Sequence, residues 1–263
     1  SDLMVSLFIL LGLIAYLKRK GFSGITFYIL GLLSKETALV FFFLILALHF
    51  VYYRNAEMPR EEKRKLLLLN FFIIGISILY WVYRGALFGI IAKNIILAPL
   101  ENPIRSFWSN ILTQSAVTLF YLRLFLWPNP LTMHHNFPIL NSLSSPLAFF
   151  SVFAIIIFIT LGLGLRKKYP LIAFGVLWYL ICLIPKFYAF LHVVAAEHHF
   201  YLPGFGIYLI LAVMLKDLYV KFRLRFMIVT TGVLGLFAIL VWFRNYEYKG
   251  ELTFWKKSVE TDP

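Results

Sequence analysis

The sequence predicts an all-helical protein that crosses a lipid bilayer several times. Hydrophobic residues make up 61% of its 263 residues, only 14% are charged, and the mean hydropathy is +0.84. A soluble domain is about 45–50% apolar and about 25% charged, so this composition excludes an ordinary soluble domain and a disordered chain. The apolar residues gather in runs, and about 20 such residues in a helix span a bilayer. The chain lacks the alternating pattern that a membrane barrel requires.

Eight apolar segments predict the helices that enter the membrane. They cover 2–17, 21–34, 37–53, 66–83, 146–165, 169–185, 199–215 and 226–243. Four short connections hold 15 of the 25 lysines and arginines, at 18–20, 54–65, 166–168 and 216–225. Because basic loops stay in the cytoplasm, we expect all four on the cytoplasmic side. The net charge of +13 therefore indicates topology, and we expect no nucleic-acid partner.

The segment between the first two basic connections must cross and return if both connections lie on one side. Its first arm, 21–34, has 14 residues, which make about 21 Å of helix. The hydrocarbon layer is about 30 Å thick, so we expect the turn at 34–37 to lie at membrane depth. The alternative is one long tilted helix through 21–53, which would place 54–65 outside.

The basic connections 54–65 and 166–168 are expected on one side, so the chain must cross the membrane an even number of times between them. Segments 66–83 and 146–165 make two crossings, which places 84–145 on the outer side, although 106–127 is apolar enough to span. We therefore expect 106–127 to form a re-entrant or interfacial helix on the outer face. Trp108, Tyr121 and Trp127 suit that depth, because their rings are apolar and their N–H and O–H groups are polar. A second external loop is expected at 186–198.

Lys35 and Glu36 are two charged residues inside an apolar run. A charge at bilayer depth is costly and usually faces a cavity or a partner. One interpretation is a mutual ion pair that closes the turn. The other is that Lys35 donates to an anionic ligand group while Glu36 orients it, because lysine is a common phosphate binder.

A second polar group, Glu197-His198-His199, opens the segment 199–215 from the outer side. Helix N-termini attract anions through free N–H groups and the helix dipole. We therefore expect His198 and His199 to join Lys35 in binding a phosphate, with Glu197 orienting them. The alternative is an aromatic interface belt with a solvated Glu–His pair.

The proline-punctuated loop 128–138 contains a candidate substrate-binding group, His134, His135 and Asn136. The external histidines lack a metal-binding spacing such as HExxH, so we expect no metal site and no cofactor. A single cysteine, Cys182, excludes an intramolecular disulfide and a multi-cysteine site.

Five motifs follow one another along nearly the whole chain. They are SDL at 1–3, LLSKETA at 32–38, LWP at 126–128, AEHHFYLPG at 196–204, and RN followed by ELTFW within 244–255. In that order they resemble the membrane region of the TMTC-like family, the transmembrane and tetratricopeptide-repeat O-mannosyltransferases and their bacterial relatives. The resemblance implies a GT-C-like glycosyltransferase fold, a polyprenyl-phosphate-linked sugar donor, and a protein or glycan acceptor.

The resemblance also implies how the chain is divided. Residues 1–243 would be the membrane domain without its N-terminal spans and first external loop. Residues 244–263 would be an external linker and the start of a tetratricopeptide-repeat helix, since 252–259 has amphipathic spacing. The family's catalytic base is expected upstream of Ser1, and His198 stands where the family usually has arginine. A histidine is only fractionally charged near neutral pH, so its phosphate contact would be weaker.

We therefore expect part of a multi-pass membrane glycosyltransferase, incomplete for catalysis, whose site and C-terminal repeats lie on the extracytoplasmic side. The tail of the lipid donor is expected near 106–127. Two other functions stay open: a non-catalytic membrane anchor for an external repeat scaffold, and a transporter of lipid-linked sugars. A transporter should show inverted repeats, which are not visible in the sequence.

Overall fold

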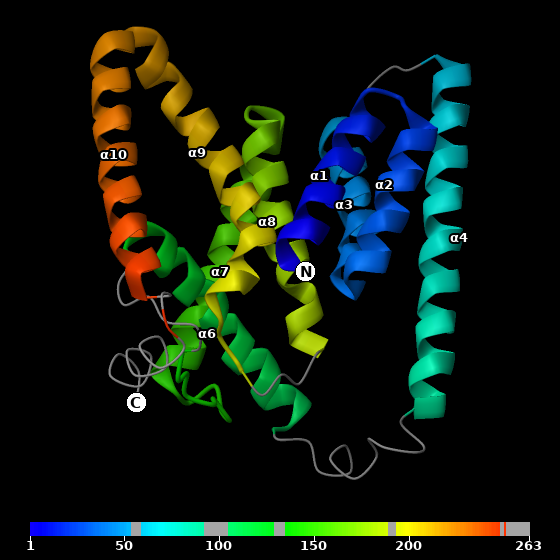
Figure 1. The fold of residues 1–263 in the computed structure, drawn as a ribbon, viewed down its shortest axis with the longest axis horizontal. Helices are drawn as coiled ribbons and strands as arrows, with labels where there is room; N and C mark the ends of the chain where they lie inside the picture. The colour runs from blue at the N-terminus through cyan, green and yellow to red at the C-terminus, as the bar shows by residue number, and fades with distance from the viewer. Residues whose placement is uncertain (54–58, 92–104, 129–134, 189–192, 248–249, 251–263) are drawn as a thin grey trace.

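The computed structural model describes residues 1–53, 59–91, 105–128, 135–188, 193–247 and 250, and this part of the chain is almost entirely helical (Figure 1). In these ranges, β-pairing is limited to one antiparallel bridge between His135 and Ala195. This confirms the all-helical prediction. The helices are α1 (Asp2–Leu17), α2 (Gly21–Ser34), η1 (Glu36–Leu39), α3 (Val40–Leu48), η2 (His49–Tyr53), α4 (Arg60–Ile91), α6 (Phe107–Leu126), α7 (Pro146–Gly164), η4 (Leu165–Lys167), α8 (Pro170–Tyr188), η5 (Glu197–Phe200), α9 (Tyr201–Lys221) and α10 (Arg223–Glu247).

Helix length separates two groups of apolar segments. Among the described residues, five helical segments are long and apolar enough to cross a bilayer: Arg60–Leu87, Pro146–Lys167, Pro170–Tyr188, Glu197–Lys221 and Arg223–Phe243. Three shorter apolar helical segments cover Asp2–Leu17, Gly21–Ser34 and Glu36–Tyr52. The eight predicted segments therefore all form helices. Their count as eight spans and their GT-C-like arrangement stay predictions.

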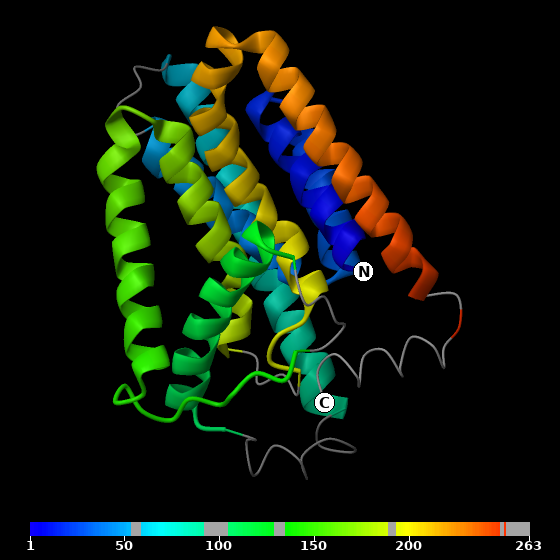
Figure 2. The ribbon, with the colours of Figure 1, turned by 90° about the vertical axis from the view of Figure 1, so that its left-hand side faces the viewer.

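The basic connections gather at one end of the helices. In Figure 1 the α1–α2, α7–α8 and α9–α10 connections and the start of α4 all lie at the top, and Figure 2 shows the same arrangement from the side. The start of α1, the α2–α3 turn and the C-terminal end of α8 lie toward the opposite end. This is the placement expected if all the basic connections lie on one side of the membrane.

The α2–α3 turn is a true reversal of the chain. Helix α2 ends at Ser34 after 14 residues, and Lys35 is extended with φ −166° and ψ 142°. Helices η1 and α3 then return beside it, so the alternative of one long helix through 21–53 is wrong. Because α4 starts at the same end as α2 and runs for 32 residues, the turn lies well within the length of α4 (Figure 1).

Helix α6 carries its polar side chains inward. It begins at the N-cap Ser106, whose hydroxyl accepts a hydrogen bond from the Ser109 amide at 3.1 Å. Asn110, Gln114 and Thr118 on its next turns are all buried. Trp108 and Trp127 are exposed, as expected for an interfacial helix. Tyr121 is buried instead, because its hydroxyl bonds to the backbone of Ala196. Helix α6 thus presents hydrogen-bonding groups to the rest of the chain.

Helices α4 and α10 flank the bundle in Figure 1 and present most of their apolar residues outward. None of the apolar window of α10 is buried within the chain, which is typical of a helix that faces lipid. Helix α10 continues to Glu247, so 244–247 belong to this helix and not to the predicted linker. The predicted repeat helix in 251–263 lies outside the described residues.

Two glycines allow α8 and α9 to cross closely. A Cβ added to Gly175 would lie 2.5 Å from the carbonyl oxygen of Gly206. A Cβ on Gly206 would collide with the carbonyl oxygen of Gly175 and lie 2.8 Å from the Tyr179 amide nitrogen. Small residues let helix backbones approach in this way. The crossing therefore sets the spacing between the two helices whose ends form the site described next.

Candidate functional site

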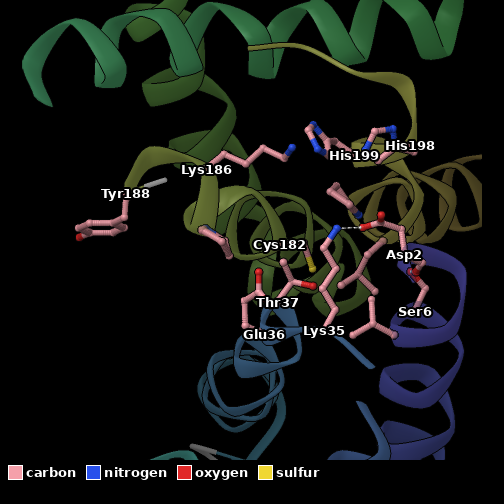
Figure 3. Close-up of a pocket in the computed structure, with 14 residues that line it drawn as sticks. Asp2, Ser6, Lys35, Glu36, Thr37, Cys182, Lys186, Tyr188, His198 and His199 are labelled. Carbon is pink, nitrogen blue, oxygen red and sulfur yellow. Dashed lines mark hydrogen bonds and ion pairs between the residues drawn. The ribbon is translucent and has the colours of Figure 1, made fainter. Parts of the chain in front are cut away.

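A cavity of about 410 Å³ opens where α1, the α2–η1 turn, α8 and the start of α9 meet. Figure 3 shows that its polar side chains come from all four of these places. Its apolar wall includes Val5, Cys182, Leu202 and Pro203. The charged and imidazole groups that line it are Asp2, Lys35, Glu36, Lys186, His198 and His199. The structure thus brings together Lys35, His198 and His199, the three residues predicted to bind phosphate.

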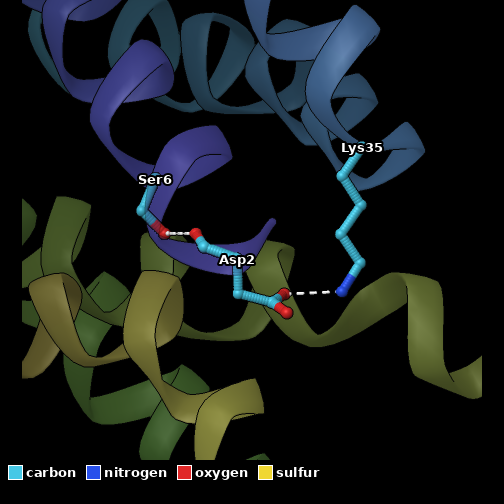
Figure 4. A network of polar contacts seen from close by, with 3 residues as sticks. All are labelled: Asp2, Ser6 and Lys35. Carbon is cyan, nitrogen blue, oxygen red and sulfur yellow. Dashed lines mark hydrogen bonds and ion pairs between the residues drawn. The ribbon is translucent and has the colours of Figure 1, made fainter.

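Lys35 forms an ion pair with Asp2 across the cavity. The Lys35 Nζ lies 2.6 Å from an Asp2 carboxylate oxygen (Figure 4). Ser6 donates a hydrogen bond to the Asp2 backbone carbonyl at 2.7 Å, which fixes the first turn of α1. The extended backbone at Lys35 breaks the helix and directs this side chain toward α1.

The carboxylate beside Lys35 is therefore not the one that the sequence predicts. Glu36 accepts a hydrogen bond from Arg84 of α4 at 3.2 Å, and its side chain is 54% exposed. Neither the mutual Lys35–Glu36 ion pair nor the predicted orienting contact forms. Adjacent residues on the two sides of a chain reversal point to different helices, which is why Lys35 meets α1 and Glu36 meets α4.

Lys186 is a functional candidate that the sequence motifs did not reveal. It lies in the last turn of α8, is 9% exposed, and its side chain extends across the cavity toward His199 (Figure 3). Its amino group has no hydrogen-bond partner in the part of the chain that the structure describes. The sequence pattern predicts an external loop from residue 186 onward, directly after Pro185. A lysine inside the apolar run 181–188 was the signal that could have found it.

His198 and His199 lie side by side in η5, with ring centroids 4.3 Å apart. The His199 Nδ1 is buried, and within the described ranges no hydrogen-bond partner reaches it. The cavity thus holds two lysines and two imidazoles around Asp2, while Glu36 is paired with Arg84. It carries a surplus of hydrogen-bond donors, which suits an anionic ligand.

Polar side chains of α6 hold the two segments that supply these groups. Asn110 donates hydrogen bonds to the carbonyls of Lys186 at 3.1 Å and Phe187 at 2.7 Å, at the end of α8. The Tyr121 hydroxyl donates to the Ala196 carbonyl at 3.0 Å and accepts from the Ala196 amide at 3.1 Å. Helix α6 therefore positions both Lys186 and the histidine pair without lining the cavity.

Replacing Tyr121 with phenylalanine tests this positioning role. The side chain is 1% exposed, and the change leaves the buried Ala196 amide without its acceptor, at a cost of about 1–3 kcal/mol. We expect a lower thermal unfolding midpoint and weaker binding of a lipid phosphate at the histidines. The matched control is Tyr219→Phe, since Tyr219 is 39% exposed on α9. Equal midpoints and affinities for the two variants would contradict the role.

The predicted substrate loop falls only partly within the described residues. His134 lies outside them, and the Asn136 side chain is exposed. The His135 amide donates to the Ala195 carbonyl at 2.9 Å, and its Nε2 lies 3.7 Å from the Glu197 carboxylate. Glu197 therefore contacts His135 and is not among the residues that line the cavity. Among the described residues, no three His, Cys, Asp or Glu side chains gather as metal ligands would.

Comparison of the chain with models of known protein families, with curated proteins and with solved structures finds no match in any of the three. The resemblance to the TMTC-like family therefore stays a prediction, and a function has to be inferred from the cavity itself.

Proposed function

We propose that this chain forms the donor-binding part of a membrane glycosyltransferase, which transfers a sugar from a polyprenyl-phosphate-linked donor to a protein or glycan acceptor on the extracytoplasmic side. The observation that carries the proposal is the buried amino group of Lys186, which has no hydrogen-bond partner among the described residues and lies in a cavity that also contains Lys35, His198 and His199. The resemblance of the sequence motifs to the TMTC-like family supports the same conclusion.

Burial makes the Lys186 amino group costly unless it has a partner. A buried donor without a partner loses its hydrogen bonds to water, and a buried charge without a partner loses still more. A phosphate oxygen would accept hydrogen bonds from Lys186, whereas Lys35 already has the Asp2 carboxylate beside it. The position of the amino group is therefore best explained by a role in binding an anion.

The surroundings of the cavity favour an anion attached to lipid. The start of α1, the α2–α3 turn and the C-terminal end of α8, which line the cavity, lie toward the end of the bundle opposite the basic connections (Figure 1), and the cavity wall is largely apolar. Donors aimed at a departing phosphate stabilise the negative charge that develops on it. Lys35 and Lys186 would hold the leaving phosphate, and Asp2 would hold Lys35 in position.

Replacing Lys35 with methionine tests the proposal in the full-length protein in nanodiscs. Farnesyl phosphate and farnesol share one tail, so their difference in affinity isolates the phosphate contact. We expect farnesyl phosphate to bind the unchanged protein about tenfold more tightly than farnesol, and Lys35→Met to remove most of that preference and sugar transfer. Lys18→Met, in an exposed basic connection, is the matched control.

The outcomes separate the proposal from the other two functions. Equal affinity for farnesyl phosphate and farnesol in the unchanged protein would contradict a donor site and would leave a membrane anchor. Flux of a lipid-linked sugar across vesicles, with no transfer to any acceptor, would contradict a transferase and favour a transporter.

A further inference from the structure

A second cavity, of about 530 Å³, lies between α1, α3, α8 and α9 and is lined mostly by apolar side chains. Helix α1 contributes Leu10, Leu13 and Leu17 to it, and α8 contributes Phe174 and Trp178. Nothing in the reaction described above uses this space.

The two cavities follow one another along the same face of α1. Asp2 and Ser6 line the first cavity, which contains Lys35 and Lys186 and is called the cationic cavity below. Leu13 and Leu17 line the second one, called the apolar cavity. With 3.6 residues per turn, these positions share one face, and α1 advances about 16 Å between Ser6 and Leu17. The two cavities therefore lie one after the other along α1, with the apolar one nearer the basic connections.

Helix α8 repeats this pattern from the other side. Lys186 and Cys182 line the cationic cavity, and Trp178 and Phe174 continue at four-residue spacing into the apolar one. The Trp178 Nε1 donates to the carbonyl of Leu202 at 2.7 Å, and Leu202 lines the cationic cavity. The two cavities are therefore neighbours that share a wall.

The apolar cavity opens on the surface between α1 and α9. Leu13 is 8% exposed at its inner wall, while Leu17 of α1 is 46% and Tyr208 of α9 is 52% exposed. These helices belong to the segments predicted to enter the membrane, so the opening faces the hydrocarbon layer. An apolar chain could enter from lipid without crossing water.

We propose that the apolar cavity holds the isoprenoid tail of the lipid whose phosphate binds among Lys35, Lys186 and the histidine pair. The inference rests on the proposed function, and it replaces 106–127 as the expected position of the tail, because α6 turns buried polar groups inward. Each methylene group that enters the cavity adds to the affinity, so binding should depend on tail length.

Filling the cavity with a larger side chain tests the inference in the full-length protein in nanodiscs. Ala212 of α9 lines the apolar cavity, whereas Ala238 lies on the exposed surface of α10. We expect Ala212→Trp to weaken binding of farnesyl phosphate about tenfold and to leave isopentenyl phosphate, which has one isoprene unit, unchanged. Ala238→Trp should change neither affinity.

The outcomes distinguish this inference from the proposed function. If Ala212→Trp leaves farnesyl phosphate binding intact while Lys35→Met weakens it, the tail lies elsewhere and the phosphate site stands. If the unchanged protein binds neither phosphate, both proposals fail.

A farnesyl phosphate with a diazirine at the end of its tail gives a second measurement that needs no variant. Crosslinks on α1, α8 or α9 beside the apolar cavity support the inference, and crosslinks confined to α4, α6 or α10 overturn it.

Discussion

Replacing Lys186 with methionine is expected to stabilise the ligand-free protein and to weaken its binding of a lipid phosphate. Methionine fills a similar volume and has no amino group, whereas the Lys186 amino group is buried with no hydrogen-bond partner in the described part of the chain. Relief of that cost should raise the free energy of unfolding by about 1–3 kcal/mol, which a thermal unfolding midpoint in detergent measures. Farnesyl phosphate should bind at least about tenfold more weakly, because one charged donor is lost.

The opposite directions of the two effects make this prediction specific. If Lys186 merely supported the fold, its replacement would lower the stability of the protein, and any weaker phosphate binding would follow from that loss of stability. Lys216→Met on the exposed side of α9 is the control, and it should change neither quantity. A fall in the midpoint of Lys186→Met would contradict the role that we assign to this residue.

Replacing Gly206 with alanine is expected to destabilise the protein strongly. The added Cβ would collide with the carbonyl oxygen of Gly175, which is backbone and cannot rotate away. Helices α8 and α9 would have to separate along their whole contact. Insertion of one carbon into a close-packed contact costs about 1–3 kcal/mol, and a backbone clash belongs at the upper end of that range.

The same substitution should weaken lipid phosphate binding, because α8 carries Lys186 and the chain entering α9 carries the histidine pair. Gly232→Ala is the matched control, since no atom lies within 4 Å of a Cβ added at that position on α10. It should leave stability unchanged or raise it slightly, because alanine favours a helix over glycine. Equal thermal midpoints for the two variants would show that the crossing tolerates wider spacing.

Sequence patterns predicted the helices well because hydropathy is a local property of the chain. Segments 2–17 and 21–34 coincide with α1 and α2, and basic connections mark one end of the bundle. Lys35 was found for the same reason, since a charge inside an apolar run is visible without any knowledge of its neighbours. The turn at 34–37 followed from arm length and parity alone.

The partners of the charged groups could not be predicted in this way. Lys35 meets Asp2, which is 33 positions away in the chain, and Glu36 meets Arg84, 48 positions away. These contacts depend on which helices lie beside the turn and on how each side chain leaves it. Lys186 escaped notice because the predicted span ended at the proline before it, whereas α8 continues through Pro185 to Tyr188.

By itself, the sequence determined that the chain is helical and apolar enough for lipid, where most of its helices begin and end, and that Lys35, His198 and His199 are candidates for a site. Only the tertiary structure decided that these three residues meet, that Lys186 joins them with no hydrogen-bond partner among the described residues, and that an apolar cavity continues along α1 and α8. The reason is physical: apolar runs are encoded residue by residue, whereas a cavity exists only through the crossing of helices that are distant in the chain.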